Sequence, residues 1–134
     1  KTMENLAVPF EGCIINDGSG LSRKNLLTAE SIVFLLRAAD ILDFKEEYRS
    51  CMAIAGIDGT LEKRMEESPA AGNLRGKTGT LRNASSLSGY VETIDGEQLV
   101  FSLLFNGNSV WYYKNAEDKI GNIMAQFFYF NQVK

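Results

Sequence analysis

Histidine is absent from this sequence of 134 residues. Without it, the chain alone can build neither a Ser-His-Asp nor a Cys-His catalytic triad, and most transition-metal sites lose their commonest ligand. Cysteine is scarce, and the two residues present, Cys13 and Cys51, form no CxxC pair. We therefore expect no metal site and no cofactor. The sequence leaves open whether the two cysteines form a disulfide or are free, buried thiols, because a domain of this size does not need a disulfide for its stability.

Long apolar runs and basic patches are also lacking. No stretch approaches the roughly 18 apolar residues of a membrane span, and none has the pattern of a secretory signal. The net charge is −3, with acids and bases interspersed, which argues against a nucleic-acid-binding protein. Length and composition predict one domain over residues 1–134. The chain opens at Lys1 rather than at Met, so we expect a longer protein upstream.

Helical patterns flank the centre of the chain. Thr28 is the predicted N-cap of a helix whose apolar face repeats at helical spacing, through Ile32, Leu35, Leu36 and Ala39. Further helical stretches are expected over about 45–53 and over 60–65, the second with a threonine N-cap. The last helix is predicted over about 115–131, with a wide apolar stripe formed by Ile120, Ile123, Met124, Phe127 and Phe128.

Strand patterns occupy the region between these helices. Residues 74–80 predict one strand, and residues 86–94 and 97–106 predict a hairpin across Asp95-Gly96, a dipeptide that favours a type I′ turn. A short buried strand is also expected near Cys13-Ile14-Ile15. The predicted fold class is α+β: a three-stranded antiparallel sheet with the C-terminal helix packed on it and a helical segment before it.

The first candidate site is Lys77-Thr78-Gly79-Thr80, at the end of a predicted strand. A lysine ammonium group stabilises a nearby substrate carboxylate and favours nearby proton transfers. Gly79 has no Cβ, so a substrate backbone can approach the strand closely. Threonine hydroxyls offer hydrogen bonds, and a backbone N–H at the strand end can serve an oxyanion hole. Taken alone, the triplet is common, and an exposed strand end carrying a lysine explains it more simply.

The second candidate is a glycine-rich stretch, Asp17-Gly18-Ser19-Gly20-Leu21-Ser22-Arg23, followed by Asn25-Leu26. It is not a phosphate-binding loop, since no Gly-Lys-Ser/Thr follows. DGSGLSR-x-N-L resembles a signature of the D-alanyl-D-alanine carboxypeptidases of the penicillin-binding protein 4 type, the peptidase S13 family. In that family the signature precedes Lys-Thr-Gly by roughly fifty residues, and the separation of Ser22 and Lys77 agrees. The stretches AGIDGTL (55–61) and SGYV (88–91) resemble two further family motifs in the same order.

This resemblance implies part of the penicillin-recognising fold shared by β-lactamases and transpeptidases. In the family, the serine of an S-x-x-K motif attacks the D-Ala-D-Ala amide of peptidoglycan stem peptides, and penicillins acylate the same serine. The implied partners are therefore stem peptides and β-lactam antibiotics, and the implied location is extracytoplasmic, in the periplasm or cell envelope. The implied catalytic residues are Lys77, Thr78, Gly79 and Thr80. The implied substrate-binding residues are Ser19, Leu21, Arg23, Thr80 and Leu81, with Arg23 pairing with a carboxylate on the stem-peptide side chain.

Two family motifs are missing from this chain. No serine has Lys three residues later, and none has Asn two residues later, so both S-x-x-K and S-x-N are absent. In the family these motifs precede the glycine-rich loop. We therefore expect the C-terminal portion of a serine carboxypeptidase that is inactive alone and contacts its N-terminal remainder. The chain alone is expected either to self-associate through apolar surface or to be stable only as a compact subdomain. The alternatives are a non-catalytic peptidoglycan-binding relative, a β-lactamase-like hydrolase and an unrelated α+β interaction domain.

Overall fold

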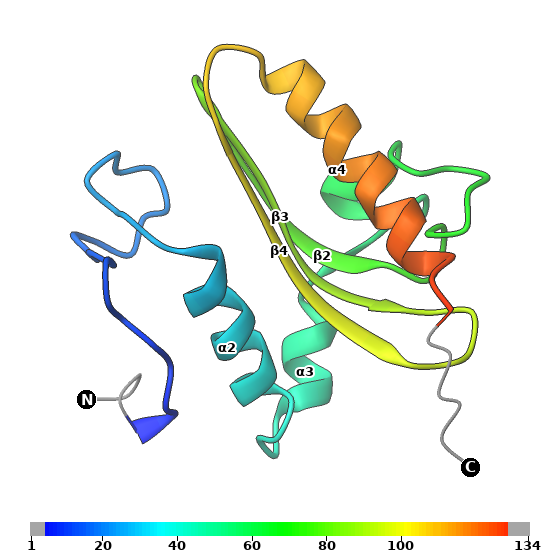
Figure 1. Ribbon diagram of the computed structural model, residues 1–134, viewed down its shortest axis with the longest axis horizontal. Helices are drawn as coiled ribbons and strands as arrows, with labels where there is room; N and C mark the ends of the chain where they lie inside the picture. Colours follow the sequence, from blue (N-terminus) through cyan, green and yellow to red (C-terminus); the bar gives the residue numbers. More distant parts are fainter. Residues whose placement is uncertain (1–4, 129–134) are drawn as a thin grey trace.

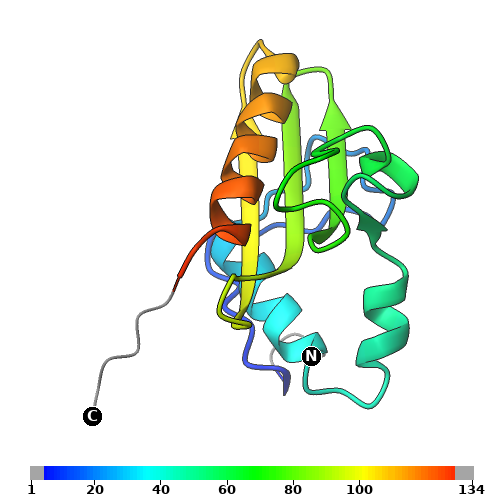
Figure 2. The same ribbon diagram turned by 90° about the vertical axis from the view of Figure 1, so that its right-hand side faces the viewer.

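A central antiparallel sheet with helices on both faces organises the chain, as the computed structural model, which describes residues 5–128, shows (Figures 1 and 2). One helix, α4, packs along one face, whereas α2 and α3 lie on the other side. The strands follow one another in the order of the chain: β1 (Ala53–Ile54), β2 (Arg75–Leu81), β3 (Ala84–Glu92) and β4 (Gln98–Asn106). The helices are α2 (Ala29–Ala39), α3 (Lys45–Ser50) and α4 (Val110–Ala125), with a 3-10 turn, η1, at Gly59–Leu61. Within residues 5–128, no helix is long and apolar enough to cross a membrane.

The sheet has four strands, one more than the sequence predicted. The additional strand β1 pairs two residues with Gly76 and Arg75 of β2, and so short a strand leaves no period-2 pattern to detect. The predicted hairpin is confirmed, with β3 and β4 paired from Ala84↔Asn106 to Glu92↔Gln98. Its turn is longer than the expected type I′ turn. Gly96 has a φ of +81°, but Asp95 has no positive φ, and the hydroxyl of Thr93 holds the turn by accepting from Glu97 N at 3.0 Å.

Helix α2 confirms its predicted start. Thr28 Oγ1 accepts a hydrogen bond from Ser31 N at 3.0 Å, and the helix buries Leu36 and Ala39. The hydroxyl of Tyr90 on β3 donates to Leu36 O at 2.7 Å, which fastens the helix to the sheet. Helix α3 ends at Ser50, short of the predicted residue 53.

Two short predicted elements are wrong. The helix predicted over 60–65 is reduced to η1, where Thr60 lies inside the turn and Asp58 stands at the N-cap position. The strand predicted near Cys13-Ile14-Ile15 is a single bridge between Ile14 and Leu26, and Ile14 and Ile15 are exposed. Both segments carry too few residues for local propensity to fix their conformation.

The two cysteines are free, so the disulfide alternative is not realised. Neither thiol is buried, because Cys51 is exposed and Cys13 is only partly covered. The Sγ of Cys13 lies 3.1 Å from Ser31 Oγ, and this hydrogen bond lowers the pKa of the thiol.

Helix α4 begins and ends earlier than predicted. Met124 of the predicted stripe packs against the core, but the fully buried residues of the helix are others. The helix buries Glu117, Gly121 and Ala125, spaced four residues apart, while the expected stripe residue Ile123 is 67% exposed. A Cβ at position 121 would lie 2.9 Å from the side chain of Leu74, so the glycine allows the helix to approach closely. Phe127 and Phe128 follow the helix and are exposed, and residues 129–131 of the predicted helix lie outside the described residues.

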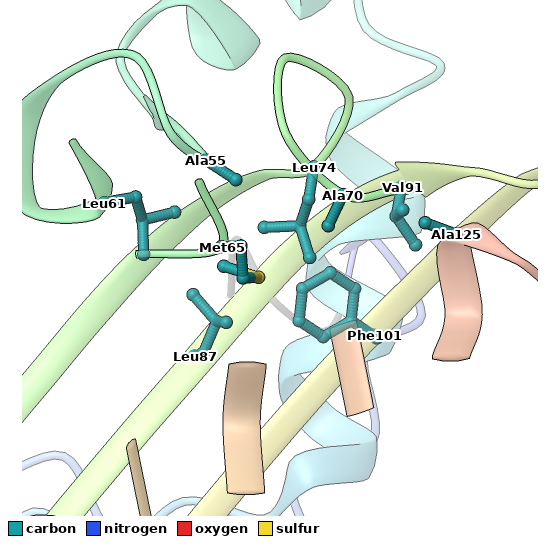
Figure 3. Packing of buried hydrophobic residues seen from close by; sticks show 9 residues of the cluster. All are labelled: Ala55, Leu61, Met65, Ala70, Leu74, Leu87, Val91, Phe101 and Ala125. Carbon is teal, nitrogen blue, oxygen red and sulfur yellow. The ribbon is translucent and has the colours of Figure 1, made fainter. Parts of the chain in front are cut away.

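The main core lies between α4 and the sheet. Leu74, Met65 and Phe101 converge there from three different segments of the chain (Figure 3). The full cluster consists of Ala55, Leu61, Met65, Ala70, Leu74, Leu87, Val91, Phe101 and Ala125. Burial of apolar surface of this extent is the main stabilising contribution to such a domain.

A buried ion pair lies beside this core. Glu117 on α4 is fully buried, and its carboxylate accepts hydrogen bonds from Ser85 Oγ at 2.7 Å and from Arg64 Nη2 at 2.9 Å. The same guanidinium donates to Asp118 Oδ1 at 2.7 Å and to Lys114 O at 3.2 Å. Burial lowers the pKa of Arg64, but the hydrogen bonds to Asp118 and Glu117 outweigh this effect and raise it overall. Arg64 thereby ties the loop after η1 to α4 and to β3.

Replacing Glu117→Gln should lower the free energy of unfolding by about 2 kcal/mol, because Arg64 loses its fully buried charged partner. Urea-induced unfolding of the chain measures this change. The matched control is Asp118→Asn, which removes the outer partner, whose side chain is 25% exposed. It should cost about 1 kcal/mol or less. A larger loss in the control than in Glu117→Gln would contradict the assignment of Glu117 as the principal partner.

Candidate active site

A cavity of about 460 Å³ joins the two stretches singled out in the sequence. It is lined by the glycine-rich loop and by β2, β3 and β4. The loop lies on the side of the sheet away from α4 (Figure 1). From the loop and the residues after it come Gly20, Ser22, Arg23, Asn25, Leu26 and Leu27. From the sheet come Gly79, Thr80, Leu81, Asn83, Ala84, Ser85, Ser86, Leu104, Phe105 and Asn106. The fold thus brings together residues that are far apart in the sequence.

Alternation along β2 divides the Lys-Thr-Gly-Thr residues between the two faces of the sheet. Thr78 lies on the α4 side, where its hydroxyl donates to Thr60 Oγ1 at 2.8 Å. Lys77 and Gly79 lie on the opposite side, where Gly79 lines the cavity and Lys77 is not among the lining residues. The Lys77 side chain is exposed, and its Nζ donates to Thr78 O at 2.8 Å. The ammonium group therefore retains donors for a ligand.

The outer edge of β2 is open over the whole motif. Strand β1 pairs with Gly76 and Arg75 alone, so among the described residues no strand covers the edge from Lys77 to Leu81. An open strand edge presents backbone N–H and C=O groups that an extended peptide can pair with. The cavity and the strand edge together form a peptide-sized site.

The glycine-rich loop is held by hydrogen bonds within itself. Asn25 Oδ1 accepts from Asn16 N at 2.7 Å and from Asp17 N at 3.2 Å, and Asn25 Nδ2 donates to Asp17 O at 3.1 Å. The hydroxyl of Ser19 donates to Asp17 Oδ1 at 2.7 Å and accepts from Leu21 N at 3.1 Å. The hydrogen bond from Ser19 lowers the pKa of Asp17, so the loop carries a charged carboxylate at neutral pH.

The substrate-binding residues expected from the loop differ in their placement. Arg23 lines the cavity, as do Thr80 and Leu81 of the strand. Ser19 and Leu21 are not among the lining residues, because the Ser19 hydroxyl is used within the loop and Leu21 is 72% exposed. The binding and catalytic roles of all these residues stay predictions.

Sequence reasoning missed the contribution of the neighbouring strand. Ser86 of β3 lines the cavity directly opposite Gly79 in the sheet register. A Cβ on Gly79 would lie 2.5 Å from Ser86 Oγ, so the room left by the glycine is occupied by this hydroxyl. The alternation of β3 was detectable in the sequence, but its register against β2 was not.

A second cavity of about 550 Å³ lies towards the other end of the sheet and contains none of the predicted site residues. Its lining includes Arg49, Arg75 and Tyr90. The guanidinium of Arg49 is already paired with Asp40 and donates to Gln98 Oε1 at 2.5 Å. Burial, aided by the charge of Asp40, raises the pKa of Tyr90 to about 12, so its hydroxyl stays protonated. This cavity lies between α3 and the sheet. Residues 5–128 contain no cluster of His, Cys, Asp or Glu side chains suited to a metal ion.

Comparison with known proteins relates this chain to D-Ala-D-Ala carboxypeptidases. A profile of the D-Ala-D-Ala carboxypeptidase 3 (S13) family matches residues 1–127. A D-alanyl-D-alanine carboxypeptidase of an Actinomadura species is 40% identical over 114 residues, which cover 81% of this chain and 21% of that protein. The D-alanyl-D-alanine carboxypeptidase DacB of Haemophilus influenzae is 31% identical over 109 residues, which cover 80% of this chain and 23% of that protein. The chain therefore spans between a fifth and a quarter of the length of these relatives.

Solved structures show the same fold. Penicillin binding protein 4 of Haemophilus influenzae matches 90% of this chain with a TM-score of 0.77 and 27% identity, and the match covers 30% of that protein. A predatory endopeptidase of Bdellovibrio bacteriovorus, acylated by penicillin G, matches 97% of this chain with a TM-score of 0.66. This second match covers 40% of that protein at 21% identity and is evidence for the fold alone. The expected α+β fold with a C-terminal helix on an antiparallel sheet is confirmed, with the four-stranded sheet as the correction, and a penicillin-binding protein is among the structures that it resembles.

Because Asn25 accepts hydrogen bonds from two backbone amides of the glycine-rich loop, its removal should speed the hydrogen exchange of these amides. In the variant Asn25→Ala, the amides of Asn16 and Asp17 should exchange with solvent about tenfold faster, because each loses its acceptor, equivalent to one hydrogen bond of about 1.4 kcal/mol. Hydrogen exchange followed by NMR measures this rate. Lys24→Ala is the matched control, since it truncates the neighbouring side chain and leaves these hydrogen bonds intact. Unchanged exchange in Asn25→Ala would show that the loop is held by other contacts.

Proposed function

The chain belongs to the D-Ala-D-Ala carboxypeptidase 3 (S13) family, and we propose that it forms one wall of the active site of a serine-type D-Ala-D-Ala peptidase. The observation that carries this proposal is the cavity that Gly79, Thr80 and Leu81 line together with Arg23 of the loop, beside the open strand edge that begins at Lys77. The proposed substrates are peptidoglycan stem peptides, which places the whole protein outside the cytoplasm. β-Lactam antibiotics are proposed to acylate the same site.

The substrate is proposed to bind as an additional strand. An extended peptide lies along the open edge from Lys77 to Leu81 and exchanges backbone hydrogen bonds with it. The terminal carboxylate of the substrate lies near the Lys77 ammonium group, which is exposed and has donors to spare. The charge of Lys77 stabilises the bound carboxylate and favours the ionised form of nearby groups.

The far end of the motif is proposed to hold the reacting carbonyl. Thr80 and Leu81 line the cavity at the end of β2, where a backbone N–H supplies a donor to the oxyanion of the tetrahedral intermediate. Thr80 pairs with Ser85, and Ser85 is fixed by its hydrogen bond to the buried Glu117. Because the strand is held in this way, the N–H donor moves little during the reaction. Electrostatic preorganisation requires donors that are fixed in place.

The glycine-rich loop is proposed to bind the stem-peptide side chain. Arg23 lines the cavity, and its guanidinium makes no ion pair with the described residues. A planar guanidinium binds a carboxylate through two parallel hydrogen bonds, which suits a diamino acid that carries a side-chain carboxylate.

The covalent chemistry is proposed to rest on residues outside this chain. A serine Oγ attacks the D-Ala-D-Ala carbonyl, the terminal D-Ala leaves as its amine after protonation, and water then hydrolyses the acyl-enzyme. This chain holds no S-x-x-K motif to supply that serine and its base. The remainder of the protein is proposed to pack on exposed apolar side chains around the loop, which include Ile14, Ile15, Leu26 and Leu27.

In the whole protein, Lys77→Ala should lower kcat/KM for a peptide ending in D-Ala-D-Ala by at least about a hundredfold, because the variant removes the cation from the site. The release of D-alanine measures this rate. The matched control is Arg75→Ala, which removes a cation two residues earlier on the same face of the same strand, in the other cavity. It should change kcat/KM by less than about threefold. Unchanged turnover in Lys77→Ala would contradict the proposed role.

The chain of 134 residues should form no covalent adduct with a fluorescent penicillin, because binding groups without a nucleophile and its base leave little chemistry. Denaturing gel electrophoresis after incubation measures the adduct, with the whole protein as the positive control. Labelling of the isolated chain at a one-to-one ratio would show that it holds its own nucleophile.

A further inference from the structure

Ser86 occupies a distinctive place in the sheet beside the proposed substrate carboxylate. It lies opposite Gly79 in the register of β2 and β3, on the face that carries Lys77. Its Oγ lies 2.5 Å from the position that a Cβ on residue 79 would take, so the hydroxyl leans over the glycine towards β2. Any larger residue at position 79 would push this hydroxyl aside.

Other serines of the sheet differ from Ser86 in one respect. Ser88, two residues later on the same face, has its hydroxyl 2.9 Å from Ser102 Oγ of β4. Ser85, on the opposite face, donates to Glu117. Ser86 makes no side-chain hydrogen bond with any residue in 5–128, although it lines the cavity. A hydroxyl that lines a cavity without a protein partner is available to a ligand.

We infer that Ser86 is a further substrate-binding residue, whose hydroxyl donates a hydrogen bond to the terminal carboxylate that Lys77 attracts. The inference rests on the proposed function. Lys77 pairs with Ser88 and Gly79 pairs with Ser86, so Lys77 and Ser86 are diagonal neighbours on one face of the sheet. An ionised carboxylate accepts several hydrogen bonds and can bind an ammonium group and a hydroxyl at once. The missing side chain of Gly79 lets the Ser86 hydroxyl lie against β2, the strand that carries Lys77.

The test compares two serines and two substrates in the whole protein. One substrate is a peptide ending in D-Ala-D-Ala, and the other is the same peptide ending in D-alaninamide, which has no terminal carboxylate. The variants are Ser86→Ala, the nearly isosteric Ser86→Cys, and the control Ser88→Ala, whose hydroxyl is bonded within the sheet. The readout is kcat/KM with each substrate, together with the melting temperature of each variant.

For the carboxylate substrate, Ser86→Ala and Ser86→Cys should lower kcat/KM by about 10- to 100-fold, the effect of one hydrogen bond to a charged group. For the amide substrate, the loss should be less than about threefold. Ser88→Ala should change kcat/KM by less than about threefold with both. This pattern separates a carboxylate contact from a structural role, which would lower the rates with both substrates alike.

Two results would overturn the inference while leaving the proposed function intact: an unchanged kcat/KM in both Ser86 variants, or equal losses with the two substrates. A wild-type protein that cleaves neither peptide, releasing no D-alanine from the first and no D-alaninamide from the second, would instead overturn the proposed function, and this inference with it. Ser86→Cys keeps the comparison decisive if Ser86→Ala unfolds, because sulfur fills the place of the oxygen but is a weak donor.

Discussion

The contact between Arg64 and the buried Glu117 is the interaction on which the arrangement of the site depends. It joins the loop after η1, helix α4 and, through Ser85, strand β3 at one point beneath the sheet. An ion pair of this kind adds little net stability compared with apolar packing, but leaving one member unpaired is costly. Its contribution is therefore geometric, because few other arrangements of these three segments satisfy all of its hydrogen bonds.

The Lys-Thr-Gly-Thr strand is supported from behind by the same segments. Thr78 is bonded to Thr60 of η1, and Thr80 pairs with Ser85, which Glu117 holds. Support on the α4 side leaves the opposite face and the outer edge of β2 free for a ligand. The two faces of the sheet accordingly differ: large apolar side chains pack under α4, whereas the cavity is lined by both polar residues such as Ser86 and apolar ones such as Leu81 and Leu104.

The elements with strong local signals were predictable from the sequence. The hydroxyl of Thr28 caps α2, and the strands of the hairpin alternate as their patterns require. Helix α4 was misjudged because its buried face is set by tertiary packing. Gly121 is inside since a side chain at that position would meet Leu74, and Glu117 is inside since Arg64 meets it there. No local rule places a glutamate in a core.

Some features of the candidate site were likewise predictable from the sequence, and others were not. Its two stretches were found through their resemblance to a family, and the structure brings both to one cavity. The place of Ser86 depends on the register between β2 and β3, and the engagement of the Ser19 hydroxyl depends on how the loop folds back onto Asp17. The register is not encoded in short-range spacing, whereas the Ser19 contact is local, because Asp17 lies only two residues earlier.

The most direct test of the account is a crystal structure of the whole protein with a bound peptide ending in D-Ala-D-Ala. The account predicts an extended peptide along the edge from Lys77 to Leu81, with its carboxylate beside Lys77 and its side-chain end towards Arg23. A peptide bound elsewhere, with that edge covered by another part of the protein, would contradict it.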